Sequence, residues 1–325
     1  MQVIKLIEAN ELLASGEVKD YYSEIRMKAK KAVDAAEAAK RQGRDLLQEI
    51  ECRPTRDLAD RCEVLIGPKG IAKRYRDLVE EMKGNRMKVM FRIFEEIVKG
   101  EFGGIEGNEK KLDQAIRTCL VLVTEGVVVS PIDGVPRIKI SKNFDGTEFV
   151  DIYYAGPIRA AGGSAAVFPL ILGDYGRKIL GLDVYKPTQD EIERYIEEME
   201  LFEEIYARQY KMTDGEVKKI IQHCPVCING EPTEKKEVSV CRDLPRIPHN
   251  RVRGGACIVM QEGIALKAMK ILSWAKMLGL DWSWLEELMK VEKESSGKIT
   301  GLKPSYQFLS RIAAGRPIFS YPLKP

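Results

Sequence analysis

The 325-residue sequence lacks long apolar runs, has only two histidines and carries almost no excess charge. None of its apolar segments reaches the roughly 18 residues that a membrane-spanning helix needs. Residues 1–9 include a glutamate and lack the apolar core of a signal peptide. We therefore expect a cytoplasmic protein with no membrane partner.

The scarcity of histidine also limits the classes of enzyme. Neither His223 nor His249 lies in a context typical of a serine or cysteine hydrolase. The net charge of +3 is too small to indicate nucleic-acid binding by itself. Any contact with DNA must therefore come from local basic patches.

Seven cysteines are present, and in a cytoplasmic protein they serve more often as buried thiols or metal ligands than as disulfides. Cys224 and Cys227 form a C-x-x-C pair, and Cys241 and His249 could complete a set of four zinc ligands. The last two lie too far apart for the usual second pair. A following turn suggests a hairpin between Cys227 and residues 237–241. We weigh zinc, redox chemistry and ordinary buried thiols, and we assign no metal ligand.

The sequence predicts an α+β fold that is helical first and mixed afterwards. We expect a helical arm or assembly segment at 1–52, a helical subdomain at 53–122, a mixed α/β domain at 123–290 and a linker at 291–325. Residues 17–48 are rich in Ala, Lys, Glu and Arg, which favours a long helix with little core of its own. Asn85 is expected to cap a helix that ends at Gly100.

Short β-type runs follow at 127–129, 137–140, 148–154 and 256–260. A capping box, Thr188 to Glu191, is expected to open a long helix, and Thr213 to Glu216 a shorter one. The long helix has five acidic residues that we place on its solvated face: Glu193, Glu197, Glu198, Glu203 and Glu204.

The most distinctive stretch is 151–182, DIYYAGPIRAAGGSAAVFPLILGDYGRKILGL, which predicts a strand, a glycine-rich turn and a helix. Ser164 is expected to cap this helix. Backbone amides at a helix start can hold phosphate. The glycine spacing matches neither dinucleotide-binding nor P-loop motifs. A packing turn, a contact with a nucleic-acid backbone and a free-nucleotide site all stay open.

Several motifs in this order resemble one family. They are TEGVVVSPIDG (124–134), KISKNFDGTEF (139–149), YYAGPIRAAGGS (153–164), NRVRGG (250–255) and LGLDWSWL (278–285). They resemble the N-terminal region of the large subunit of archaeal DNA polymerase II, the family D replicative enzyme. The resemblance runs from about Thr55 to the last residues, where the chain ends abruptly towards the expected polymerase core.

The resemblance implies a DNA-directed DNA polymerase, a nucleotidyltransferase, in a heterodimer whose small subunit carries a 3′ to 5′ exonuclease. The family's catalytic aspartates lie in a motif like NADFDGD, which is absent here. NFDG at 143–146 shares letters with it but lies between two predicted strands, so we interpret it as a turn. We expect no catalytic residue and no cofactor in this part, and magnesium in the whole enzyme.

The basic residues that we expect to bind nucleic acid lie in three places. They are Lys139 and Lys142 at the sheet, Arg159 in the glycine turn, and Arg246, Arg251 and Arg253 in a segment whose prolines and glycines predict an exposed loop. Arginine forks fit phosphate oxygens. For the lysines, a solvated sheet face without DNA is the competing interpretation.

The expected function is therefore a non-catalytic platform that supports subunit assembly and DNA binding. Its expected partners are the small subunit, primer-template DNA and, through the helix at 17–48, a second copy. Two alternatives stay open. One is a nucleotide-binding enzyme that uses the turn from Gly156 to Gly163, and the other is an assembly scaffold without DNA contact.

Overall fold

In the computed structural model the described residues are 16–44, 55, 57–124, 132–206 and 210–286. They divide into two compact units, one before and one after the Gly104–Ile105 bond. Helices dominate and one small sheet is present, which confirms the predicted α+β fold. Within these residues no helix is both long and apolar enough to cross a membrane. The domain limits expected from the sequence stay a prediction.

The first unit contains only helices among its described residues. They are α2 (Gly16–Arg41), α3 (Leu58–Leu65), α4 (Ile71–Glu81) and α5 (Arg86–Lys99). The Asn85 side chain accepts a bond from the Lys88 amide at 3.2 Å, and Gly100 ends α5 with a positive φ, as predicted. Arg74 of α4 donates to the nearly buried carboxylate of Glu96 at 2.6 Å and 2.9 Å, which ties α4 to α5.

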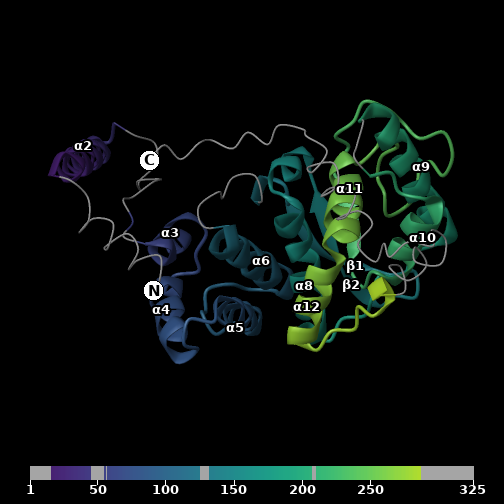
Figure 1. The fold of residues 1–325 in the computed structure, drawn as a ribbon, viewed down its shortest axis with the longest axis horizontal. Helices are drawn as coiled ribbons and strands as arrows, with labels where there is room; N and C mark the ends of the chain where they lie inside the picture. The colour runs from purple at the N-terminus through teal and green to yellow at the C-terminus, as the bar shows by residue number, and fades with distance from the viewer. Residues whose placement is uncertain (1–15, 45–54, 56, 125–131, 207–209, 287–325) are drawn as a thin grey trace. The chain divides into compact units, whose positions relative to one another are not determined.

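The second unit is built around a three-stranded sheet (Figure 1). Strand β2 (Glu148–Tyr154) lies in the centre, antiparallel to β1 (Arg137–Lys142) and parallel to β3 (Cys227–Gly230). The predicted runs at 137–140 and 148–154 are thus confirmed. The run at 127–129 lies outside the described residues. The expected hairpin between Cys227 and residues 237–241 is wrong, because β3 pairs with β2 and Glu237 forms only an isolated bridge to Arg251.

The described part of the second unit also contains helices, which are named in chain order. They are α6 (Asn108–Thr124), α8 (Gly163–Leu180), α9 (Gln189–Ile205), α10 (Asp214–His223), α11 (Gly254–Ile258) and α12 (Leu266–Leu278). A 3₁₀ turn (Gly156–Ala160) precedes α8, and a π-helix (Val259–Ala265) joins α11 to α12. Both predicted capping boxes are present, at Thr188 and Thr213.

Each face of the sheet has a distinct character. Gly173 of α8 lies against Val150 and Ile152, so this face is the apolar core. Side chains alternate along a strand, so the opposite face carries Asp151 together with Asn229 of β3. This second face is also buried and combines Asp151 and Asn229 with the rings of Phe149 and Tyr153.

The run at 256–260 was predicted as a strand, and that prediction is wrong. These residues form α11 and the first turn of the π-helix, and all five are buried. A short apolar run has no period that separates a buried strand from a buried helix. The helical form depends on Gly255, where an added Cβ would lie 2.7 Å from the carbonyl carbon of Tyr154.

The predicted cap at Ser164 is also wrong, because the cap and the helix start lie two residues earlier than predicted and Gly162 occupies the capping position with a positive φ. Gly163 follows directly, and an added Cβ there would collide with the carbonyl oxygen of Glu262. The glycine turn therefore brings α8 into backbone contact with the π-helix.

Replacing Gly255 with Ala should destabilise the protein, because the new methyl group meets backbone atoms that cannot move independently. We expect a loss of about 1–3 kcal/mol in the free energy of unfolding, measured by chemical denaturation. Gly215→Ala is the matched control, because nothing lies within 4 Å of a Cβ there and its φ is ordinary. Equal losses in both variants would contradict this packing argument.

Candidate nucleic-acid interface

The two predicted lysines of β1 point to opposite faces of the sheet. Lys139 pairs with Asp151 across the ladder and places its ammonium 5.2 Å from the ring centre of Tyr153. Lys142 pairs with Glu148 and is exposed. Arg137, on the same face as Lys139, stacks on Tyr153 at 4.4 Å and donates to Glu231 at 3.0 Å. The lysines are accessible but do not form one continuous patch.

Arg159 projects from the 3₁₀ turn and is engaged on both sides of its guanidinium. It forms an ion pair with Glu234, whose side chain is 7% exposed. It also donates to the Tyr206 hydroxyl at 2.7 Å and stacks over that ring at 4.5 Å. The Tyr206 hydroxyl in turn donates to Glu234 at 2.8 Å. Arg159 thus ties the glycine turn to the end of α9.

Arg246 lies in a largely enclosed setting. Its guanidinium donates to Glu191 of the α9 capping box at 2.7 Å and to the Lys186 carbonyl at 2.9 Å. The rings of Phe144 and Tyr185 lie 4.5 Å and 5.0 Å from it. With 14% of its side chain exposed, Arg246 joins the β1–β2 hairpin tip to the start of α9.

Arg253 was expected in an exposed loop, and that expectation is wrong. Its side chain is 0% exposed and donates to Glu198 at 2.9 Å and to Asn229 at 3.0 Å. The plane of Arg253 also stacks on Tyr195 at 4.3 Å. The buried guanidinium of Arg253 forms an ion pair with Glu198. Glu198 was expected on the solvated face of α9, and its side chain is likewise 0% exposed.

Glu198 holds a second buried arginine that sequence reasoning missed. Arg194, one turn earlier on α9, donates to Glu198 at 2.6 Å and is 0% exposed. It also donates to the carbonyls of Cys241 at 3.2 Å and His249 at 2.9 Å. The i, i+4 spacing of Arg194 and Glu198 was the available signal. We define Arg194, Glu198 and Arg253 as the buried arginine–glutamate cluster.

Arg251 remains partly accessible between these anchored residues. Its Nε donates to the Glu234 carbonyl at 2.7 Å, and residue 251 bridges to Glu237. Of the three arginines expected in the loop, it alone has no carboxylate partner among the described residues. Arg251 is therefore the member of this group best able to meet an external phosphate.

Asp151 is a buried carboxylate on the polar face of the sheet. It accepts bonds from Asn229 at 3.2 Å and Ser141 at 3.3 Å, while its Oδ1 has no partner. Burial raises the pKa of Asp151 from its ordinary value of 3.8 to about 6, although the bond from Asn229 opposes the rise. The protonation of Asp151 therefore changes close to neutral pH.

The cysteines show why zinc is not supported. Cys227 lies 3.7 Å from the Tyr195 hydroxyl, whereas the sulfur of Cys241 faces Glu193 at 3.8 Å. Burial raises the pKa of Cys224 to about 12, which keeps its thiol protonated. Six cysteines of the described part are free thiols, and no group of three or more His, Cys, Asp or Glu residues there is arranged to hold a metal ion. The same search of the described residues shows no cluster of carboxylates that fits magnesium.

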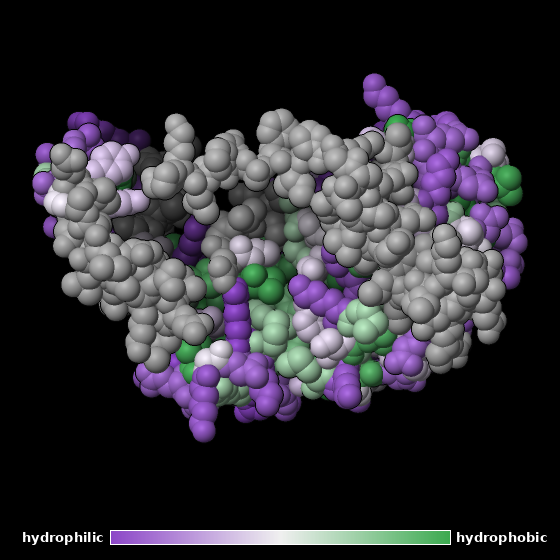
Figure 2. All heavy atoms as spheres, viewed as in Figure 1, coloured by the Kyte–Doolittle hydropathy of each residue, from purple (hydrophilic) through white to green (hydrophobic). Residues whose placement is uncertain are grey.

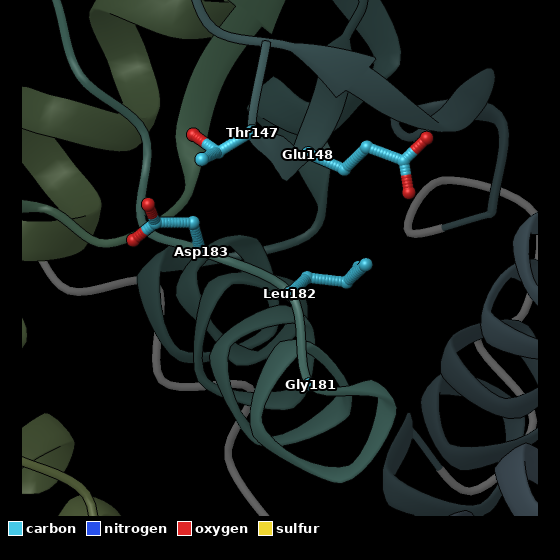
Figure 3. Close-up of a pocket in the computed structure, with 5 residues that line it drawn as sticks. All are labelled: Thr147, Glu148, Gly181, Leu182 and Asp183. Atoms are coloured by element: carbon cyan, nitrogen blue, oxygen red, sulfur yellow. The ribbon is translucent and has the colours of Figure 1, made fainter. Parts of the chain in front are cut away.

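A surface pocket lies next to the Lys142 end of the β1–β2 ladder, where Lys142 pairs with Glu148. It is lined by Thr147, Glu148, Gly181, Leu182 and Asp183 (Figure 3). The two carboxylates give it an acidic wall, although Lys186 forms an ion pair with Asp183 at 2.5 Å. This chemistry does not favour an anionic ligand such as a nucleotide.

Comparison with known proteins identifies a matching family and similar sequences. The family described as "DNA polymerase II large subunit DP2, N-terminal" matches residues 20–291. A DNA polymerase II large subunit of Methanococcoides burtonii is 42% identical over 325 residues, covering 97% of this chain and 28% of that protein. Those of Methanosphaera stadtmanae and Archaeoglobus fulgidus are 43% and 40% identical, covering 93% and 94% of this chain.

The match covers most of the chain and defines the class as the N-terminal region of a polymerase large subunit. The chain belongs to the archaeal DNA polymerase II large subunit family, which confirms the resemblance of its motifs. It spans only 26–28% of the length of the three relatives described above.

Replacing Glu198 with Gln should destabilise the protein strongly. The change keeps the shape but leaves Arg194 and Arg253 buried without a counter-charge, which typically lowers the free energy of unfolding by about 3–5 kcal/mol. Glu200→Gln, an exposed position on the same helix, is the matched control. Chemical denaturation distinguishes the two, and a loss below about 1 kcal/mol for Glu198→Gln would contradict the role of the cluster.

Asp151 should make stability depend on pH. The pKa of Asp151 is higher in the folded than in the unfolded state. Its contribution to the free energy of unfolding is therefore fully present below pH 3.8 and is lost as the pH rises through about 6. At about 1.4 kcal/mol per pKa unit, the loss amounts to about 3 kcal/mol.

Asp151→Asn should remove this loss, so that the variant gains stability over the wild type between pH 4 and 7. Denaturation curves across this range measure the difference, with Glu148→Gln on the same strand as control. Parallel pH profiles for the wild type and Asp151→Asn would contradict the assignment.

Proposed function

We propose that this chain is the non-catalytic N-terminal platform of a template-directed DNA polymerase that acts in the cytoplasm. The whole enzyme would join the large subunit to a small subunit with 3′ to 5′ exonuclease activity and would use magnesium held elsewhere in the longer polypeptide. The single observation that carries this proposal is the family match over 20–291.

Within this platform we assign two different roles to the predicted basic residues. Lys139, Lys142 and Arg251 have no carboxylate partner among the described residues, and we propose that they bind DNA phosphates. Arg246 and Arg253 instead hold the 241–253 segment in place through Glu191 and Glu198. Arg159 could serve both roles, because its side chain is partly accessible to DNA phosphates and is also paired with Glu234.

Reconstitution tests the platform role directly. A full-length large subunit, the small subunit and magnesium should extend a primer, and deletion of residues 1–325 should abolish extension. The isolated chain 1–325 should show no extension. Nucleotide addition by the isolated chain, or full activity without it, would contradict the proposal.

DNA binding is tested by replacing Lys139, Lys142 and Arg251 together with Ala in the full-length subunit. Affinity for primer-template DNA should fall uniformly across sequences. The salt slope of binding should decrease by about one for each phosphate that the variant no longer neutralises. Lys218→Ala on α10 is a control for an exposed lysine elsewhere. Unchanged affinity and slope would support an assembly scaffold that does not bind DNA.

A further inference from the structure

The outer side of α12 exposes two large apolar side chains. Met269 and Met277 are 55% and 44% exposed, whereas Ile271 and Trp274 on the inner side are buried. The two methionines are eight residues apart, so they lie on the same side about 12 Å along the helix axis. Methionine adapts to varied partner surfaces and is frequent in binding grooves. This spacing offers two anchor positions two helical turns apart.

Lysines flank the methionines on both sides. At 100° per residue, Lys270 and Lys276 lie on opposite borders of the strip that contains Met269 and Met277. Lys270 donates to the Ser164 hydroxyl at 3.1 Å and lies 5.1 Å from the Trp274 ring centre. Helix α12 contains no Asp or Glu. In the part of the chain described here, neither lysine is paired with a carboxylate.

This combination restricts the chemistry of an occupant. Figure 2 shows hydrophilic and hydrophobic side chains next to one another where Figure 1 places α12. A phosphate backbone would satisfy Lys270 and Lys276 but would offer nothing to the methionines. An acidic amphipathic helix satisfies both, because its apolar stripe meets the methionines at i and i+7 or i+8 while its carboxylates meet the lysines.

We propose that the outer face of α12, made of Met269, Lys270, Ser273, Lys276 and Met277, binds an acidic amphipathic helix of the small subunit. This inference deepens the proposed function and rests on its assembly role. The relatives are named large subunits, and the proposed function pairs this chain with a small subunit. The charge and apolar pattern of the face then selects the segment of that partner.

Site-specific cross-linking in the reconstituted enzyme tests the proposal. Met269 and Met277 are replaced singly with the photo-cross-linker p-benzoylphenylalanine in the full-length large subunit, and the products are mapped by mass spectrometry. Both positions should cross-link to one small-subunit peptide with acidic residues bordering an apolar stripe. The matched control is Val240, which is 62% exposed on another surface and should not label that peptide.

Charge reversal tests the lysines independently. Lys270→Glu with Lys276→Glu should reduce cross-linking from position 269 by about tenfold or more, because like charges would then face each other. Lys218→Glu with Lys235→Glu, two exposed lysines elsewhere, should leave it unchanged. Circular dichroism melting verifies that all variants are folded.

Three outcomes would overturn the proposal: no cross-link to the small subunit, cross-links only to DNA, or cross-links only within the large subunit. Primer extension by the same preparations reports separately on the proposed function. Normal extension without the cross-link would refute the α12 site alone, whereas full extension after deletion of residues 1–325 would refute the platform role.

Discussion

One buried carboxylate, Glu198, determines how the second unit is assembled. It receives Arg194 from its own helix and Arg253 from the start of α11, and none of the three side chains is exposed. Two guanidiniums against one carboxylate leave a positive excess in a region with little water. Backbone carbonyls of residues 241 and 249 and the Asn229 side chain supply further acceptors, while the Nη2 of Arg253 has no hydrogen-bond partner in the described part of the chain. Removing the negative charge of Glu198 would leave two buried guanidiniums without a counter-charge.

The cluster also explains why a segment without regular structure is well defined. Residues 231–253 contain only one isolated bridge, yet Arg194 fixes their main chain from beneath and Arg246 fixes their middle to Glu191. These side-chain hydrogen bonds add to the backbone bonds that the amides of Glu234, Val238 and Val252 donate within the segment, so both kinds of bond supply partners for its main-chain polar groups. Polar contacts of this kind have directional geometry, so they specify one path for the segment where apolar packing alone would allow several.

The sequence contained enough to predict the elements whose signals are local. The caps at Asn85, Thr188 and Thr213 depend on residues within one turn, and the β1–β2 pair follows from alternation around an Asp-Gly turn. The parallel partner of β2 and the helix at 254–258 depend on contacts between distant segments. Gly255 accepts such an approach because it lacks a Cβ. Contacts with a distant segment, and not the local sequence pattern, therefore determine the pairing of β2 with β3 and the helical form of 254–258.

The same distinction separates the arginines from the lysines of the predicted site. The sequence identified Arg159, Arg246 and Arg253 as basic residues but could not show that each has a carboxylate partner far away in the chain. A guanidinium is less strongly hydrated than an ammonium and presents a planar fork, so it is better suited to burial against a carboxylate. Lysines keep their charge in water, and in the described part Lys139, Lys142, Lys270 and Lys276 have no carboxylate partner. In the proposed function the lysines of β1 and Arg251 would therefore meet external phosphates, while Arg159, Arg246 and Arg253 maintain the structure that presents them.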